Sequence, residues 1–409
     1  MACCSMRLAR IRGAYRLNTL LHPPSRTAVR ISLATAFSLL GDQVLYSVLP
    51  VHFQSFGLLP YQVGVLLSAN RWIRLLTNRL AHRAHQRVPA SLLFPAAMVL
   101  GVATTLMYTR TSSFAWLLLA RLLWGLAWSF IRHVGVLAIM SEVTAERAGQ
   151  TMGYYNGIAR LGAVGGLFGG ALLVETAGFA PAIVILAGIS LTSIPLSLGV
   201  RHIADEEPSE ISHSGTQGRD ATLLALGFSL GAVGPGFVMS TLGHVLQSQL
   251  GAGIDLMGFH LGVATFTGAL LAVRFVLDSV GAPVLGALGD RFGLRFTGVL
   301  FFALGAAALS LATTAQGIGT LTPAVIAFFL CSTALTAAVS GAAAQRGSEV
   351  YSRYVTAGDI GAASGPLLGW IAMELVDSPV LGLALGAGFY ALAAAISATF
   401  LRKRARPSA

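Results

Sequence analysis

Long apolar segments, separated by short polar breaks, follow one another along most of the chain. Each is about 20 residues long, the length that a helix needs to cross the hydrocarbon core of a bilayer. We expect twelve membrane-spanning helices, near residues 31–53, 60–81, 89–109, 114–136, 151–173, 179–200, 222–248, 259–285, 296–314, 319–342, 352–374 and 379–401. The pattern predicts an all-α membrane protein.

The polar stretch at residues 201–220 divides these spans into two sets of six. Its Ser, Gly, Pro and acidic residues are typical of a flexible linker. We therefore expect six-helix bundles at residues 31–200 and 221–401. Residues 1–30 are expected to form a basic tail, and residues 402–409 a second, short tail.

Composition agrees with a membrane protein. Apolar residues make up 55% of the chain and charged residues only 11%, and the mean hydropathy is +0.73. A soluble chain carries about 25% charged residues. Most of this protein's surface is therefore expected to face lipid.

The net charge of +11 comes from arginines in particular places. They gather in both tails and after the second expected span, whereas the loops expected on the opposite side carry no Lys or Arg apart from Arg110. This positive-inside pattern predicts a multi-pass protein of the inner membrane with both termini in the cytoplasm. No basic module interleaved with aromatic residues is present, so we expect no nucleic-acid partner.

The sequence carries no pattern that is typical of a catalytic centre. It has no nucleophile elbow, paired-carboxylate motif or phosphate-binding loop, and its histidines lack metal-ligand spacing. We therefore expect no enzyme activity, no cofactor, no bound metal and no ATP-driven step.

Two segments in opposite halves of the chain resemble one another. The first runs from Arg147 through Arg160 into a series of glycines, and the second runs from Arg346 through Asp359 into a similar series. A duplicated, glycine-rich membrane helix with a charge inside it is typical of a transporter built from two related halves. The two bundles are therefore expected to be pseudo-symmetric.

Charged side chains inside the spans are costly unless they are paired or hydrated, so they mark candidate pathways for solute and protons. The candidates are Asp42, Arg71, Arg121, Arg160, Arg274, Asp278 and Asp359, together with the neutral Asn156, which shares a helix face with Arg160. Structural alternatives remain open for some of them. Arg274 and Asp278 are four residues apart and can neutralise one another. Arg71 and Arg74, which share a helix face with Asn78, can extend toward the headgroups. Asp42 can bond to a neighbouring helix.

Small residues in the fifth and eleventh spans are expected to allow close helix packing. They are Gly165, Gly169, Gly361, Gly365, Pro366 and Gly369.

The sharpest local motif lies between the eighth and ninth spans and comprises Gly286, Asp290, Arg291, Gly293 and Arg295. Gly286 allows two helices to approach, Gly293 suits a tight turn, and Asp290 is expected to hold a neighbouring helix at the gate. The motif resembles the loop signature of the major facilitator superfamily. The corresponding first-half segment has His82 where Gly286 stands and Gln86 where Asp290 stands.

Three further segments resemble drug/proton antiporters of this superfamily. They begin at Gly41-Asp42 in the first span, at Arg121 in the fourth and at Gly165 in the fifth. The fifth-span segment has Gly166 where those antiporters have proline, and the intact Gly-Pro-x-x-Gly form occurs at Gly365 in the eleventh.

The resemblance implies a secondary active transporter whose two halves rock around a central cavity. We expect proton-coupled efflux of a small solute by a monomer in the bilayer, with Asp42 or Asp359 protonated on one side and released on the other. Uptake of an organic anion is the alternative, because arginines outnumber aspartates among the intramembrane charges. A non-transporting scaffold or sensor is a further alternative.

Overall fold

The computed structural model describes residues 24–110, 113–141, 145–198, 217–251, 253–256 and 258–402. The first half is helical. It comprises α3 (Arg26–His52), α4 (Pro60–His85), α5 (Ala90–Met107), α6 (Phe114–Met140), α7 (Ala145–Val164), the π-helical turn η1 (Gly165–Gly170), α8 (Ala171–Ala177), α9 (Phe179–Ser190) and α10 (Ser193–Ser197).

The second half repeats this arrangement with one added hairpin. It comprises α11 (Gln217–Gly231), η2 (Ala232–Val238), α12 (Met239–Leu250), β1 (Gly253–Leu256), β2 (Phe259–Gly262), α13 (Val263–Val276), η3 (Leu277–Gly281), α14 (Ala282–Thr314), α15 (Ile318–Ala344), α16 (Ser348–Val376) and α17 (Leu381–Arg402). The helices and π-helical turns join into six crossings in each half. The protein has the expected all-α fold of twelve membrane-spanning helices.

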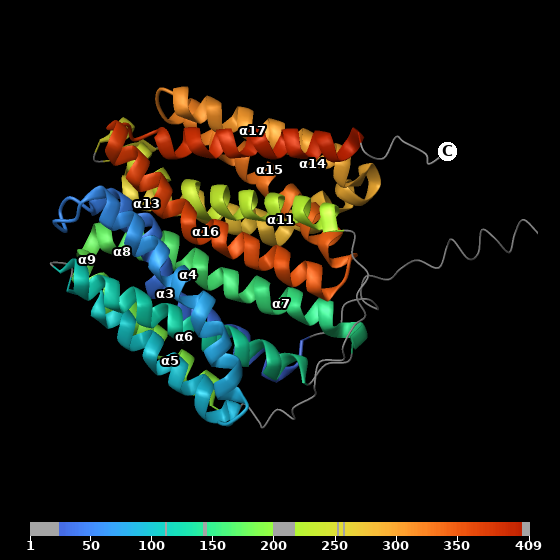
Figure 1. Cartoon of the computed structure of the whole chain (residues 1–409). Coiled ribbons are helices and arrows are strands. Elements are labelled where there is room, and N and C mark those ends of the chain that lie inside the picture. Colours follow the sequence, from blue (N-terminus) through green and yellow to red (C-terminus); the bar gives the residue numbers. More distant parts are fainter. Residues whose placement is uncertain are drawn as a thin grey trace, which may run out of the picture.

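The two halves lie against one another, with first-half helices in the lower part of Figure 1 and second-half helices in the upper part. We call the end where α3 begins and α17 ends the tail side, and the end where α3 meets α4 the far side. A cluster of buried apolar side chains, including Val48, Leu67, Phe237 and Leu271, extends through both halves. The core therefore continues across the interface between them.

Two crossings differ from the others in polarity. Among the described residues, ten helices are long and apolar enough to cross a membrane. The remaining two crossings, α4 and α16, carry Arg71, Arg74 and Asp359 and pack against each other across the interface between the halves. Lower hydropathy is tolerated there because these polar side chains face protein instead of lipid.

Several boundaries differ from those expected. Helix α3 begins at Arg26 and α11 at Gln217, so the ends of the expected tail and linker are helical. Residues 1–23, 199–216 and 403–409, which hold the rest of both tails and of the linker, lie outside the described residues.

The expected eighth span also begins later than predicted. Strands β1 and β2 pair antiparallel on the far side, and α13 starts only at Val263. Gly251 and Gly258 adopt positive φ, which ends the helix and turns the hairpin.

The loop motif before the ninth span is partly helical. Gly293 has φ 79° and ψ 152°, and it breaks α14 into two pieces, as expected for a tight turn. Arg291 is exposed and lies over the ring of Phe292, with 5.6 Å between its guanidinium carbon and the ring centroid. Arg295 is exposed as well. The surroundings of Gly286 and the side chain of Asp290 lie outside the described part, so the gate contact of Asp290 stays a prediction.

The second-half glycines lie in close helix contacts. A Cβ on Gly361 would lie 2.2 Å from the carbonyl oxygen of Phe228, and one on Gly365 would lie 2.5 Å from that of Ala232. At Gly369 the nearest atom, on Phe237, is 3.0 Å away. Helix α16 therefore approaches α11 and η2 at backbone distance.

The first-half glycines depart from the expectation. Gly169 has no neighbour within 4 Å of a Cβ position, and Gly165 meets only a Leu side chain at 3.1 Å. The close contacts with α3 fall instead on Gly162, Gly166 and Gly170. These three residues recur every fourth position and so share one face of the helix. Gly165 and Gly169 lie one position away from that face.

Candidate functional site

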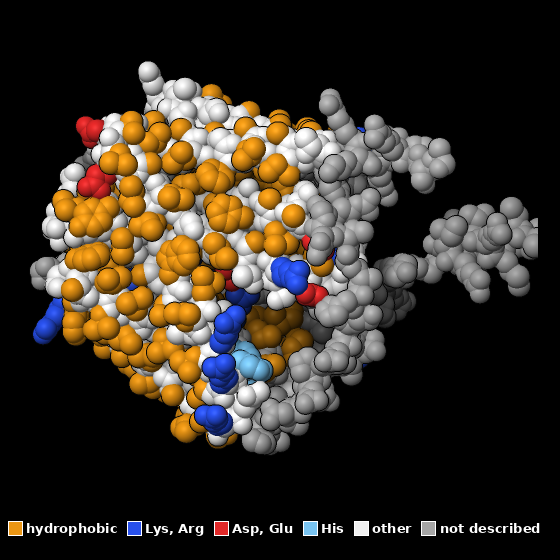
Figure 2. Space-filling model, viewed as in Figure 1, with side chains coloured by type: hydrophobic (Ala, Val, Ile, Leu, Met, Phe, Trp, Pro, Cys, Tyr) orange, Lys and Arg blue, Asp and Glu red, His pale blue; other side chains and the backbone are white. Residues whose placement is uncertain are grey.

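A cavity of about 480 Å³ lies between α4, α6 and α16 in the tail-side part of the molecule. Its polar lining includes Asn78, Ser129, Arg132, Thr356 and Asp359. Figure 2 shows a hollow on this face, with apolar side chains inside it and basic side chains and a histidine at its rim. The cavity is large enough for a small organic solute and reaches side chains of both halves.

Asp359 and Arg74 form an ion pair between the two halves beside this cavity. The Arg74 Nη2 atom is 3.4 Å from the Asp359 Oδ1 atom. Asp359 lies roughly 16 Å along α16 from its tail-side end, given a rise of 1.5 Å per residue. The side chain of Asp359 is 29% exposed, so solvent in the cavity reaches the carboxylate.

A second ion pair joins the halves, again with the arginine in the first half and the aspartate in the second. The Arg160 Nη2 atom on α7 is 3.9 Å from the Asp278 Oδ2 atom on η3, and Thr333 donates a hydrogen bond of 2.6 Å to Asp278. Arg160 and Asp359 occupy corresponding places in the sequence repeat, and the interval from Arg74 to Asp278 is close to theirs. The pseudo-symmetry therefore places an arginine and an aspartate at each of two matching contacts.

Arg71 fastens α4 to two segments of the other half. Its Nη1 atom donates hydrogen bonds of 2.7 Å to the carbonyl of Pro235 and 2.6 Å to that of Ala362. The Ala362 carbonyl is free to accept because Pro366, four residues later, has no N–H to donate. The guanidinium also lies over the ring of Tyr46, 5.4 Å from its centroid. Arg71 therefore faces the interface between the halves and does not extend toward the headgroups.

Arg274 lies in α13, one position before the residue that corresponds to Arg71 in the repeat. Its Nη1 atom lies 3.8 Å from the sulfur of Met239, and its guanidinium lies beside Gly234. Asp278 bonds to Arg160 and Thr333, and no ion pair between Arg274 and Asp278 occurs among the described contacts. The π-helical turn η3 begins just after Arg274 and changes the spacing of the two side chains.

Asp42 and Arg121 are buried together inside the first half. Arg121 forms an ion pair with Asp42, and its Nε atom donates a hydrogen bond of 2.8 Å to the carbonyl of Leu66. Asn70 and Gln43 donate further hydrogen bonds to Asp42, of 3.3 and 2.9 Å. Arg121 is 1% exposed and Asp42 3%. The structural alternative for Asp42, a bond to a neighbouring helix, is the arrangement that the structure contains.

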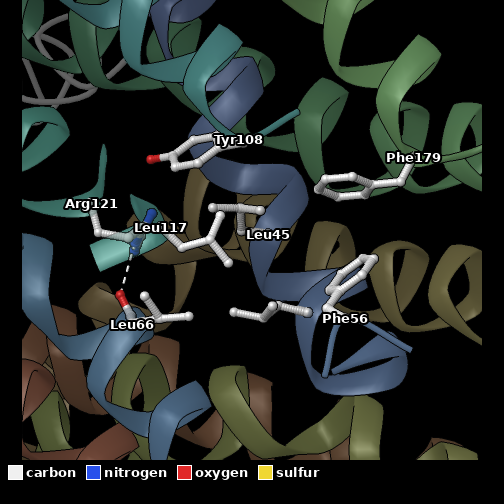
Figure 3. A pocket seen from close by; sticks show the side chains of 8 residues that line it. Leu45, Phe56, Leu66, Tyr108, Leu117, Arg121 and Phe179 are labelled. Carbon is white, nitrogen blue, oxygen red and sulfur yellow. Dashed lines mark hydrogen bonds between the residues drawn. The ribbon is translucent and has the colours of Figure 1, made fainter. Parts of the chain in front are cut away.

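A small apolar cavity adjoins this pair. Figure 3 shows the Tyr108 ring, Leu45, Phe56 and Phe179 around it, with Arg121 at its edge bonded to Leu66. Its volume of about 10 Å³ is enough for one water molecule. This second cavity is therefore too small for an organic solute.

The remaining predicted residue, Asn156, is exposed on α7, and no described contact involves its side chain. The sequence places Arg74 on one helix face with Arg71 and Asn78, but it does not identify Arg74 as the partner of Asp359. Thr333, which bonds to Asp278, was not predicted. Thr333 carries no such signal, because a lone Thr in an apolar helix usually bonds to its own backbone.

Solved structures of transporters share this architecture. A bacterial homologue of the human lysosomal transporter Spinster, in an inward-facing and unoccupied conformation, matches with a TM-score of 0.72 at 15% identity, covering 93% of this chain and 98% of that one. A mutant of the nucleoside transporter NupG matches with a TM-score of 0.70 at 14% identity, covering 92% and 100%. At these identities the match establishes the fold alone.

Curated relatives match over a shorter segment. Synaptic vesicular amine transporters from Homo sapiens and Rattus norvegicus are each 28% identical over 165 residues, 40% of this chain. The aligned segment spans only 31% of the length of those relatives. The family model of the Major Facilitator Superfamily matches residues 31–366. Because this match covers most of the chain, the protein belongs to the major facilitator superfamily and is a multi-pass membrane transporter.

Proposed function

We propose that the protein is a proton-coupled efflux transporter of small solutes, of the drug/proton antiporter type. The observation that carries the proposal is the Asp359–Arg74 ion pair, which joins the two halves and lies at the wall of the cavity. Its carboxylate is accessible from the cavity and is held by a cation of the opposite half. Protonation of Asp359 would remove one charge of a contact that must open when the halves move.

Coupling follows from competition at this pair. A proton on Asp359 weakens its attraction to Arg74, and a cationic solute in the cavity competes with Arg74 for the same carboxylate. The solute and the proton therefore occupy the site in turn, which is the requirement for exchange. Two states with different affinities for proton and solute are sufficient for each gradient to drive the other.

Three features support the proposed direction of transport and the proposed chemical class of the solute. Arginines at the tail side favour a cytoplasmic location for that side by the positive-inside pattern, so the cavity would open inward. The segments around Asp42, Arg121 and Gly165 resemble those of antiporters. The partial match to vesicular amine transporters favours a solute with an amine, which a cavity carboxylate suits.

Uptake of an organic anion is the second candidate, and Arg132 favours it. This arginine is exposed at the cavity wall, and among the described contacts it forms no ion pair. It would attract a carboxylate or phosphate group of a solute. The two candidates therefore assign opposite charges to the solute.

Reconstitution into proteoliposomes with an imposed pH gradient tests the proposal. A fluorescent organic cation and a fluorescent organic anion serve as probes, and a pH-sensitive dye inside the vesicles reports proton movement. We expect an acidic interior to drive accumulation of the cation with loss of internal protons, and Asp359→Asn to abolish both. Accumulation of the anion only, driven by an acidic exterior, would favour uptake, and movement of neither probe with any proton flux would refute the proposal.

Asp255→Asn is the matched control for this assay. Its carboxylate is 85% exposed in the far-side hairpin, away from the cavity. Transport should continue unchanged in this variant, so that loss in Asp359→Asn is attributable to the cavity carboxylate.

A further inference from the structure

Two carboxylates hold the halves together on the far side, and neither belongs to the two ion pairs described above. Glu175, at the end of α8, accepts a hydrogen bond of 3.1 Å from the backbone N–H of Thr265 and a second from the Thr265 hydroxyl. Glu374, near the end of α16, accepts a hydrogen bond of 3.0 Å from the backbone N–H of Tyr61. Each contact joins one half of the protein to the other.

Both carboxylates bind the first turn of a helix in the opposite half. Thr265 is the third residue of α13, and Tyr61 is the second residue of α4. Backbone N–H groups in a first turn have no partner within their own helix, and the helix dipole favours a negative charge there. The carboxylates therefore act as N-terminal caps supplied from the opposite half. Figure 1 shows that α8 and α13 lie near one another at this end.

The two caps are copies of one another under the pseudo-symmetry. The interval from Glu175 to Glu374 equals that from Arg160 to Asp359. The interval from Tyr61 to Thr265 likewise equals that from Arg74 to Asp278. The symmetry that relates the two ion pairs therefore also relates the two caps.

The backbone at Gly262 is adapted to the first cap. A Cβ at this position, just before α13, would lie 2.2 Å from the carboxyl carbon of Glu175. Any larger residue would displace the carboxylate from the Thr265 N–H that it caps. Glu175 is half-buried, whereas Glu374 and Tyr61 are exposed, so the first cap is expected to be the stronger because water competes less there.

We propose that Glu175 and Glu374 are gating residues that keep the far side closed while the cavity is open at the tail side. When the far side opens, α8 separates from α13 and α16 from α4, and both caps are lost. The four helix termini then become hydrated, and the energy of the caps sets the equilibrium between the two states. This inference requires movement of the halves but does not depend on proton coupling or on the solute.

Distance measurements between spin labels test the gate without any transport. Labels at Ser55→Cys and Ser248→Cys, both exposed near the far side and on opposite halves, report its opening in a background without Cys3, Cys4 and Cys331. We expect Glu175→Gln to raise the ratio of long to short distances roughly tenfold and Glu374→Gln to raise it about threefold, the range that loss of a negative charge at a helix N-terminus produces. The double variant should approach the product of the two.

Two further variants separate the gate from general effects. Asp377→Asn removes the same charge three residues after Glu374, where no described contact crosses between the halves, and should leave the distances unchanged. Gly262→Ala keeps both carboxylates but displaces that of Glu175, and should shift the distances as Glu175→Gln does. Distances in Gly262→Ala and in the double Gln variant that match those of Asp377→Asn would overturn the proposal. Loss of proton coupling alone would overturn only the proposed function.

Discussion

Removal of the Arg121 guanidinium is expected to destabilise the first half strongly. Arg121 is 1% exposed and Asp42 3%, so the Asp42 carboxylate would be left inside the protein without its cation. The Leu66 carbonyl would also lose its donor. The amide donors Asn70 and Gln43 remain, but they do not neutralise the charge. Breaking a buried pair in this way typically costs about 3–5 kcal/mol.

Arg121→Met tests this magnitude because Met keeps much of the side-chain volume. Chemical unfolding in detergent, followed by circular dichroism, should give a loss of about 3–5 kcal/mol in the free energy of unfolding. The double variant Asp42→Asn/Arg121→Met leaves no buried charge and should recover most of the loss. Arg110→Met, at an exposed arginine, is the control and should remain within about 0.5 kcal/mol of the wild type.

A loss below about 1 kcal/mol in Arg121→Met would contradict the reasoning, because that value is typical of an exposed pair. A double variant no more stable than the single one would do so as well. Either result would mean that water hydrates Asp42 when Arg121 is absent.

Three further changes, a charge exchange and two glycine substitutions, test other contacts in the protein. Exchanging the charges, as Arg74→Asp with Asp359→Arg, should restore part of the attachment between α4 and α16 that either single change removes, measured as thermal stability in detergent. Gly361→Ala places a methyl group 2.2 Å from the Phe228 carbonyl oxygen and should cost about 1–3 kcal/mol of unfolding free energy. Gly293→Ala forces a side chain into a positive φ of 79° and should cost about 1 kcal/mol, measured in the same unfolding assay.

Each of these three predictions has a result that would contradict it. A charge-exchanged protein less stable than both single variants would show that the residues around the pair determine which position carries the arginine and which the aspartate. Gly358→Ala is the control for Gly361→Ala, since its nearest contact is 3.4 Å away; equal losses in both would exclude close packing as the cause. An unchanged stability in Gly293→Ala would mean that the turn adapts without strain.

The sequence was sufficient for the architecture because span length and repeat symmetry are local properties that can be read along the chain. The twelve apolar segments and the correspondence of Arg160 with Asp359 depend on spacing alone. The ion-pair partner of each of these two residues depends on which helices meet across the interface. Neither hydropathy nor motif carries that information, so Arg74 was not recognised as the partner of Asp359.

Irregular backbone geometry accounts for other differences between the contacts predicted from the sequence and those in the structure. The pairing expected within one helix, between Arg274 and Asp278, assumed continuous α-helical spacing, and a π-helical turn begins between them. In η1 the glycines that pack on α3 are Gly166 and Gly170, whereas Gly169 faces open space. A glycine-rich segment offers several possible contact faces, and the packing against a particular neighbour selects among them.

In the proposed mechanism a proton and the solute compete at the carboxylate of Asp359. This competition can be followed by proton release, measured with a pH indicator as a transported solute is added to the purified protein in weakly buffered detergent. We expect release from the wild type, none from Asp359→Asn, and wild-type release from Asp255→Asn. Binding of the solute to the wild type without release, or equal release from Asp359→Asn, would contradict it.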